Sequence, residues 1–89
     1  MKINDNFVLR QIADTWVVLP LGDATLDFNG MITLNETGSY LWSVLEGGCD
    51  EPELVEALLS EYEVSREQAE ADVEEFLGKL RNIDCLEEI

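Results

Sequence analysis

The sequence predicts an α+β domain in which a small antiparallel sheet of three to four strands precedes three helices. Three observations support this class. The first third is rich in β-branched and aromatic residues and is broken by turn signals, apolar residues recur at helical spacing from Asn35 onward, and a capping residue stands before each of three helical segments. The 89 residues are enough for one compact domain, residues 1–89, and too few for two.

The first two predicted strands form a hairpin. Phe7–Ile12 and Thr15–Pro20 are rich in strand-forming residues, and only Ala13-Asp14 separates them. The second run is continuously apolar from Trp16 to Leu19, so we expect both of its faces to be covered. Pro20 should end this strand because proline has no N–H to donate to a ladder.

A second and tighter hairpin is predicted around Asn29-Gly30, which joins Thr25–Phe28 to Met31–Leu34. Asn-Gly is favoured at such turns because a type I′ turn needs positive φ at both central positions. Met31–Leu34 is short and carries no charge that would block pairing. At a sheet edge, its N–H and C=O groups would be free to pair with another chain.

Each of the three helices that follow has its own N-cap. Asn35 caps the first helix, which ends at Gly47-Gly48, and Asp50 caps the second. Ser65 caps the third, where Ser65 and Gln68 have the spacing of a capping box. The apolar stripe of the third helix comprises Ala69, Val73, Phe76, Leu77, Leu80 and Ile83. A small sheet followed by three helices is a winged-helix-like arrangement.

The charge of the chain excludes several classes of partner. The net charge is -15, and Asp50–Ile89 carries fourteen acidic residues against three basic ones. Such a surface repels nucleic acid and anionic membranes and attracts a basic partner. The exposed positions of the third helix are acidic, so it cannot serve as a DNA recognition helix. No run is long enough to span a membrane and no signal peptide is apparent, so we expect a cytoplasmic location.

The sequence offers little for catalysis. It contains no histidine, which removes the commonest general base and metal ligand. Cys49 and Cys85 are far apart and are expected to be free thiols in a reducing compartment. The glycines match no phosphate-binding loop. We therefore assign no catalytic residue, metal site or cofactor, and we do not expect an enzyme.

The segment Gly30–Trp42 resembles the PqqD family closely, and its most specific part is Leu34-Asn35 followed by the helical Gly38 and Trp42. Weaker matches extend the resemblance to most of the chain, residues 23–88. Members of this family are small recognition elements for ribosomally made, post-translationally modified peptides. The resemblance implies a non-catalytic adaptor that binds the leader of a precursor peptide. It also implies delivery of that precursor to a modifying enzyme, often a radical-SAM protein.

The resemblance further implies that the leader adds as a strand to the sheet edge, in a groove against the third helix. The candidate edge is Met31, Ile32, Thr33 and Leu34. The candidate residues of the third helix are Asp72, Val73, Phe76, Lys79, Leu80 and Ile83. A core role is an alternative for Val73, Phe76 and Leu80, and the pattern does not decide which flank of the helix faces the groove. An extra strand from Phe7–Pro20 would block the site if it covered the Met31 edge.

Two other interpretations remain open from the residues alone. The chain could be an acidic scaffold or regulatory subunit that binds a folded protein through its helices, in which case binding should weaken steeply with salt. Alternatively, two copies could form a homodimer by pairing their Met31 edges.

Overall fold

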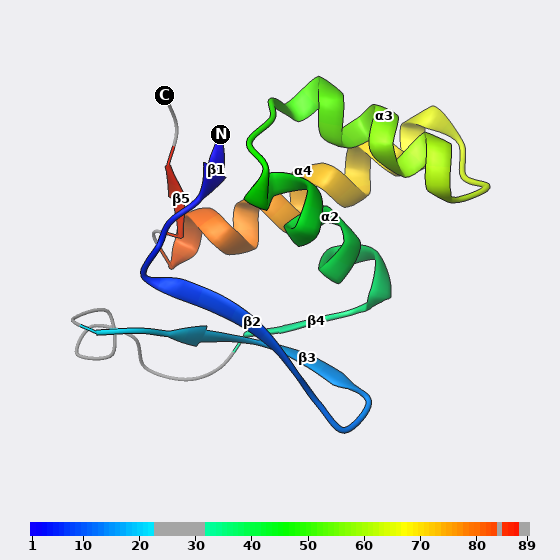
Figure 1. Cartoon of the computed structure of the whole chain (residues 1–89). Helices are drawn as coiled ribbons and strands as arrows, with labels where there is room; N and C mark the ends of the chain where they lie inside the picture. The colour runs from blue at the N-terminus through cyan, green and yellow to red at the C-terminus, as the bar shows by residue number, and fades with distance from the viewer. Residues whose placement is uncertain (23–31, 84, 88–89) are drawn as a thin grey trace.

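The computed structural model describes residues 1–22, 32–83 and 85–87, and in it a layer of strands lies against a cluster of helices (Figure 1). Element labels follow Figure 1. The strands are β1 (Lys2–Ile3), β2 (Phe7–Ile12), β3 (Thr15–Pro20), β4 (Ile32–Leu34) and β5 (Leu86–Glu87). The helices are α2 (Glu36–Glu46), α3 (Glu51–Glu61) and α4 (Arg66–Asn82). The predicted α+β class, with strands followed by three helices, is confirmed.

The main sheet is an antiparallel meander with the strand order β2-β3-β4. The predicted first hairpin is present, with Phe7 opposite Pro20 and Ile12 opposite Thr15. The central strand β3 buries both of its faces, since the adjacent Val17 and Val18 are 3% and 0% exposed. This confirms the expectation drawn from its continuous apolar run.

Strand β4 lies at an edge of this sheet. It pairs with β3 through Trp16 opposite Leu34 and Val18 opposite Ile32. Within residues 1–22, 32–83 and 85–87, no strand pairs with the outer side of β4. The β2 strand that could have covered this edge lies at the opposite edge of the sheet. The Asn29-Gly30 hairpin, its Thr25–Phe28 strand and Met31 lie outside the described residues.

The first two helices begin where their capping residues predict. The Asn35 side chain accepts a hydrogen bond from the Gly38 N–H at 2.8 Å, which fixes the start of α2 directly after β4. Asp50 and Glu53 form a complete capping box at the start of α3. Each bond satisfies an N–H that a helix leaves free in its first turn.

The third helix begins at the predicted residue, but its predicted capping box is incomplete. Ser65 Oγ accepts from the Gln68 N–H at 3.1 Å. The Gln68 side chain, however, donates to Asp72 Oδ1 at 2.8 Å, one turn further along α4, and does not return to the Ser65 N–H. The prediction of a reciprocal box was therefore wrong. A carboxylate at i+4 competes with it because hydrogen bonds to charged acceptors are stronger.

The core forms between the sheet and the three helices. Val73, Leu77 and Leu80 of α4 are fully buried. They pack in one cluster with Val18 and Leu34 of the sheet. Ile83 is half-buried and follows the last residue of α4 as its C-cap. The apolar stripe of α4 therefore holds the helix against the sheet, and only its borders can contact anything else.

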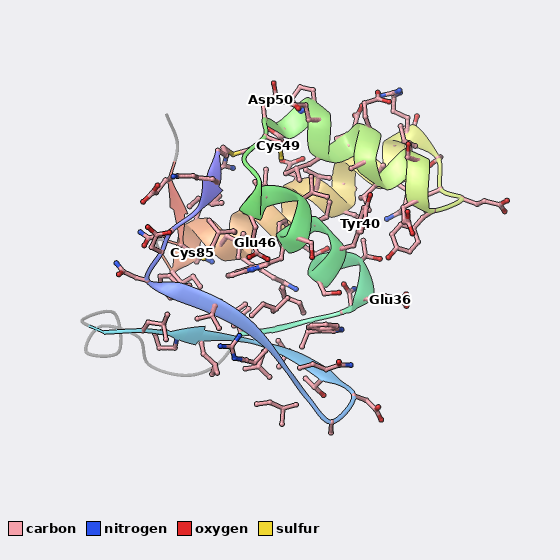
Figure 2. All side chains as sticks on the ribbon, viewed as in Figure 1. Glu36, Tyr40, Glu46, Cys49, Asp50 and Cys85 are labelled. Carbon is pink, nitrogen blue, oxygen red and sulfur yellow. The ribbon has the colours of Figure 1, made fainter. Side chains whose placement is uncertain are left out.

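A second sheet of two short strands, which the sequence did not predict, ties the N-terminal segment to the residues that follow α4. Ile3 pairs with Leu86 and Lys2 with Glu87, and Lys2 Nζ lies 3.7 Å from Glu87 Oε2. Cys49 and Cys85 are free thiols, as expected. Cys49 precedes α3 and Cys85 follows α4 (Figure 2). None of the described helices is long and apolar enough to cross a membrane.

Candidate functional site

A groove runs between the end of β4, the first turns of α2 and one flank of α4. We call it the β4–α4 groove. It encloses a cavity of about 90 Å³. One side is lined by Leu34, Asn35, Thr37, Gly38 and Leu41, and the other by Asp72, Glu75, Phe76 and Lys79. The groove thus lies at the end of β4, where the chain enters α2, and has α4 as its far wall.

Three apolar side chains, each almost fully buried, form the floor of the groove. Leu34, Leu41 and Phe76 all line the cavity and are 6%, 0% and 5% exposed. They belong to the main hydrophobic cluster, so their positions are fixed by packing on all other sides. Only narrow edges of Leu34 and Phe76 reach the surface of the groove, and Leu41 supports them from below.

The rim of the groove is charged. Asp72 is half-buried, while Glu75 and Lys79 are exposed. Lys79 Nζ lies 3.8 Å from Glu75 Oε1, an i,i+4 pair whose side chains are 50% and 72% exposed and which contributes only tenths of a kcal/mol. Asp72 accepts from the Gln68 amide. The described part of the chain provides no Lys or Arg within salt-bridge distance of Asp72.

The structure separates the candidate residues into three groups. Leu34, Asp72, Phe76 and Lys79 meet around the groove. Thr33 is exposed on β4 and Ile32 is half-buried against the core. Val73, Leu80 and Ile83 pack in or against the core and do not line the cavity, and Met31 lies outside the described residues. The sequence pattern left open which flank of α4 faces the groove. In the structure, the flank that lines the groove carries Asp72 and Phe76.

Sequence reasoning missed the contribution of α2 and of Glu75. Because Asn35 caps α2 immediately after β4, the first turn of α2 must lie at the end of the groove. A Cβ atom at Gly38 would lie 3.2 Å from the Leu34 Cβ, so a larger residue would push this turn and β4 apart by a few tenths of an ångström. Glu75 stands three residues after Asp72 and four residues before Lys79. This spacing places all three on one face of the helix and could have predicted that Glu75 borders the groove.

The other edge of the sheet, β2, also borders a cavity. Its volume is about 250 Å³, and its lining includes Phe7, Leu9, Arg10, Trp42 and Glu46. Strand β1 and helix α2 supply the far side of this cavity. Among the described residues, the sheet ends in β2 on one side and β4 on the other, and the groove walled by α4 lies at the β4 side.

The groups with shifted pKa values lie away from the β4–α4 groove. Burial raises the pKa of the Cys85 thiol to about 12. Burial, followed by repulsion from Glu53, raises the pKa of Cys49, and burial also raises that of Tyr62. The described residues contain no group of three His, Cys, Asp or Glu side chains that could hold a metal ion. The groove itself presents apolar and charged side chains suited to binding.

The comparison with protein families agrees with this geometry. The sequence model of the family described as coenzyme PQQ synthesis protein D (PqqD) matches residues 15–86. The chain belongs to the PqqD family. This confirms the resemblance drawn from Gly30–Trp42, and the match extends over β3, β4 and all three helices. No curated protein is significantly similar to the chain in sequence.

Two solved structures have the same fold as this PqqD-family chain. One is TbiB1 in complex with the TbiA(beta) leader peptide, with 37% identity and a TM-score of 0.76 over 100% of this chain and 98% of that one. The other is lasso peptide synthetase B1 complexed with the leader peptide, with 25% identity and a TM-score of 0.70 over 91% and 89% of the two chains. Both of these proteins were solved with a leader peptide bound.

Proposed function

We propose that this chain is a non-catalytic adaptor that captures the leader of a precursor peptide as an additional strand on β4. The observation that carries the proposal is the strand order β2-β3-β4, with the β4–α4 groove at the end of the outer strand. Strand addition takes affinity from main-chain hydrogen bonds and specificity from pockets for alternate side chains. An edge strand supplies the main-chain groups, and the groove at its end, with an apolar floor and a charged rim, supplies contacts for side chains.

Thr33 is the proposed centre of the docking edge. In an antiparallel ladder, residues bonded to the neighbouring strand alternate with residues whose N–H and C=O point away from it. We infer that the pairs at the two ends of the ladder, Trp16–Leu34 and Val18–Ile32, are the bonded ones. The N–H and C=O of Thr33 would then point outward, toward an incoming strand.

The groove supplies the side-chain selectivity. The edges of Leu34 and Phe76 would receive an apolar side chain of the leader, and Asp72, Glu75 and Lys79 would contact its neighbours. Val73, Leu80 and Ile83 would act indirectly, because they hold α4 against the sheet. Of the residues first considered for the site, we therefore propose Thr33, Leu34, Asp72, Phe76 and Lys79 as direct contacts.

The adaptor would present the bound precursor to a modifying enzyme in the cytoplasm, where ribosomes make the peptide. The family resemblance suggests a radical-SAM enzyme, whereas the likeness to lasso peptide synthetase B1 favours an enzyme of lasso peptide biosynthesis. We propose the second class because it rests on likeness over 91% of this chain. Co-purification with each kind of enzyme, with and without a leader, would decide between them.

The proposal is tested by titrating ¹⁵N-labelled protein with leader peptides. Suitable peptides are the TbiA(beta) leader and the leaders of short precursors encoded beside the gene for this chain. We expect amide shifts at β4, at the first turn of α2 and at Asp72–Lys79. A scrambled peptide of the same composition is the matched control. Shifts centred on Phe7–Ile12 would place the peptide on the β2 edge, and the absence of shifts with every leader would refute the proposal.

Dimerisation through β4 is the competing use of the same edge. Two copies that paired there would each bring a net charge of -15 to the contact. Repulsion of that size disfavours self-association at low salt. We therefore propose that the edge serves a peptide and not a second copy. Sedimentation equilibrium at low and high salt, with and without a leader, would detect a dimer that the peptide displaces.

A further inference from the structure

The charged rim of the β4–α4 groove suggests which leader sequences it selects, an inference that rests on the proposed function. Two acidic residues, Asp72 and Glu75, and one basic residue, Lys79, border the cavity. Lys79 and Glu75 already form a pair. Among the described residues, Asp72 has no cationic partner and accepts only from the neutral Gln68 amide. The rim therefore carries one negative charge that is left to a ligand.

The spacing along α4 places this charge at a defined distance from the apolar floor. Asp72 precedes Phe76 by four residues, so both lie on one face of α4 and are about 6 Å apart along its axis. In an extended peptide, side chains two residues apart lie on one face and are separated by about 6.6 Å. On a peptide strand that runs along α4, an apolar side chain over Phe76 would therefore bring the side chain two positions away close to Asp72.

We propose that the β4–α4 groove selects peptides in which an apolar residue stands two positions from Lys or Arg. The apolar side chain contacts the accessible edges of Leu34 and Phe76, and the cation meets Asp72, with Glu75 one turn away. Half-burial of Asp72 strengthens the contact because a partly desolvated charge is screened less than an exposed one. Because the peptide is held as a strand on β4, its Lys or Arg side chain approaches Asp72 from the β4 side of the groove.

General attraction to an acidic protein is the alternative that must be separated from this local contact. The opposite flank of α4 provides a matched control, because Glu70 and Glu74 are exposed and line a different cavity between α3 and α4. Two double variants change the net charge by the same amount: Asp72→Lys/Glu75→Lys at the groove and Glu70→Lys/Glu74→Lys on the opposite flank. Only the first pair alters the rim of the groove.

The test is a selection from a phage-displayed library of random twelve-residue peptides. Wild-type protein is used as bait, and peptides that also bind Thr33→Pro are discarded. We expect an enriched apolar residue with Lys or Arg two positions away. Synthetic peptides of this pattern should bind the Asp72→Lys/Glu75→Lys variant at least tenfold more weakly and the control variant within twofold of wild type. If the reversed variant unfolds, Asp72→Asn with Glu75→Gln should still weaken binding severalfold.

Three outcomes would count against the proposal. Enrichment of apolar residues without a basic neighbour would overturn the charge preference while leaving the adaptor function intact. Equal weakening in the reversed and control variants would show that only the overall charge matters. If the library yields no peptide whose binding depends on Thr33, the proposed function fails together with this inference.

Discussion

Replacing Thr33 with proline should weaken leader binding while leaving the helical core folded. Proline removes the N–H that we infer to point outward from the middle of β4, and its ring occupies the space where the incoming strand would pair. The Thr33 side chain is exposed, so its loss removes little buried surface. Ile32 and Leu34, which face the core, are unchanged.

The size of the effect follows from the lost hydrogen bond. A leader carbonyl left without its donor costs about 1–3 kcal/mol. Since 1.4 kcal/mol corresponds to a tenfold change in Kd, binding should weaken by about fivefold to about a hundredfold. The free energy of unfolding should fall by about 1 kcal/mol or more, because proline fits the backbone of an extended strand residue poorly.

Fluorescence anisotropy with a labelled leader measures the Kd, and urea denaturation measures the stability. Thr33→Val is the matched control because valine keeps the N–H and the branching at Cβ, and it should bind like wild type. A folded Thr33→Pro protein that binds the leader with unchanged Kd would refute strand addition at β4. If the Thr33→Pro protein binds with unchanged Kd and this binding weakens steeply with salt, the result would instead support the acidic-scaffold interpretation.

Three further predictions concern residues around the groove. Leu80→Ala removes a fully buried side chain and should cost about 2–5 kcal/mol of unfolding free energy in urea titrations, with the Kd of the folded protein unchanged; a weaker Kd at unchanged stability would make Leu80 a contact residue. Asn35→Ala removes the 2.8 Å cap at the Gly38 N–H and should cost about 0.5–2 kcal/mol in the same titration, so an unchanged midpoint would contradict the role of the cap. Because burial raises the pKa of Cys85 to about 12 from 9.0, the unfolded chain loses this proton first, and stability should fall as pH rises above 9. Urea midpoints between pH 8 and 10 under reducing conditions test this, and Cys85→Ala should reduce the slope.

The sequence predicted the local features of the fold well because their causes are local. Asn35, Asp50 and Ser65 each cap a helix at the predicted residue, since an N-cap bond spans only three residues. The Phe7–Pro20 hairpin likewise depends on neighbouring residues. The reciprocal box at Ser65 failed because Asp72, outside the motif, bonds the Gln68 side chain.

Features of the fold that depend on contacts between distant residues could not be predicted from local sequence patterns. Strands β1 and β5 contain two residues each and pair across most of the chain, so neither has a periodic pattern to detect. The helical stripe gave the buried face of α4, but only packing on the sheet decides that Asp72 rather than Glu74 borders the groove. The position of β4 at the sheet edge depends on the strand order, which two hairpin predictions alone leave open.

Amide hydrogen exchange at β4 tests the central claim most directly. If a leader adds to the outer edge, the Thr33 N–H acquires an acceptor, and its exchange should slow by the factor set by leader occupancy and affinity. The amides of β2, at the other edge, should show no comparable change. Unchanged exchange at Thr33 in a protein saturated with leader, or new protection confined to Phe7–Ile12, would contradict the account.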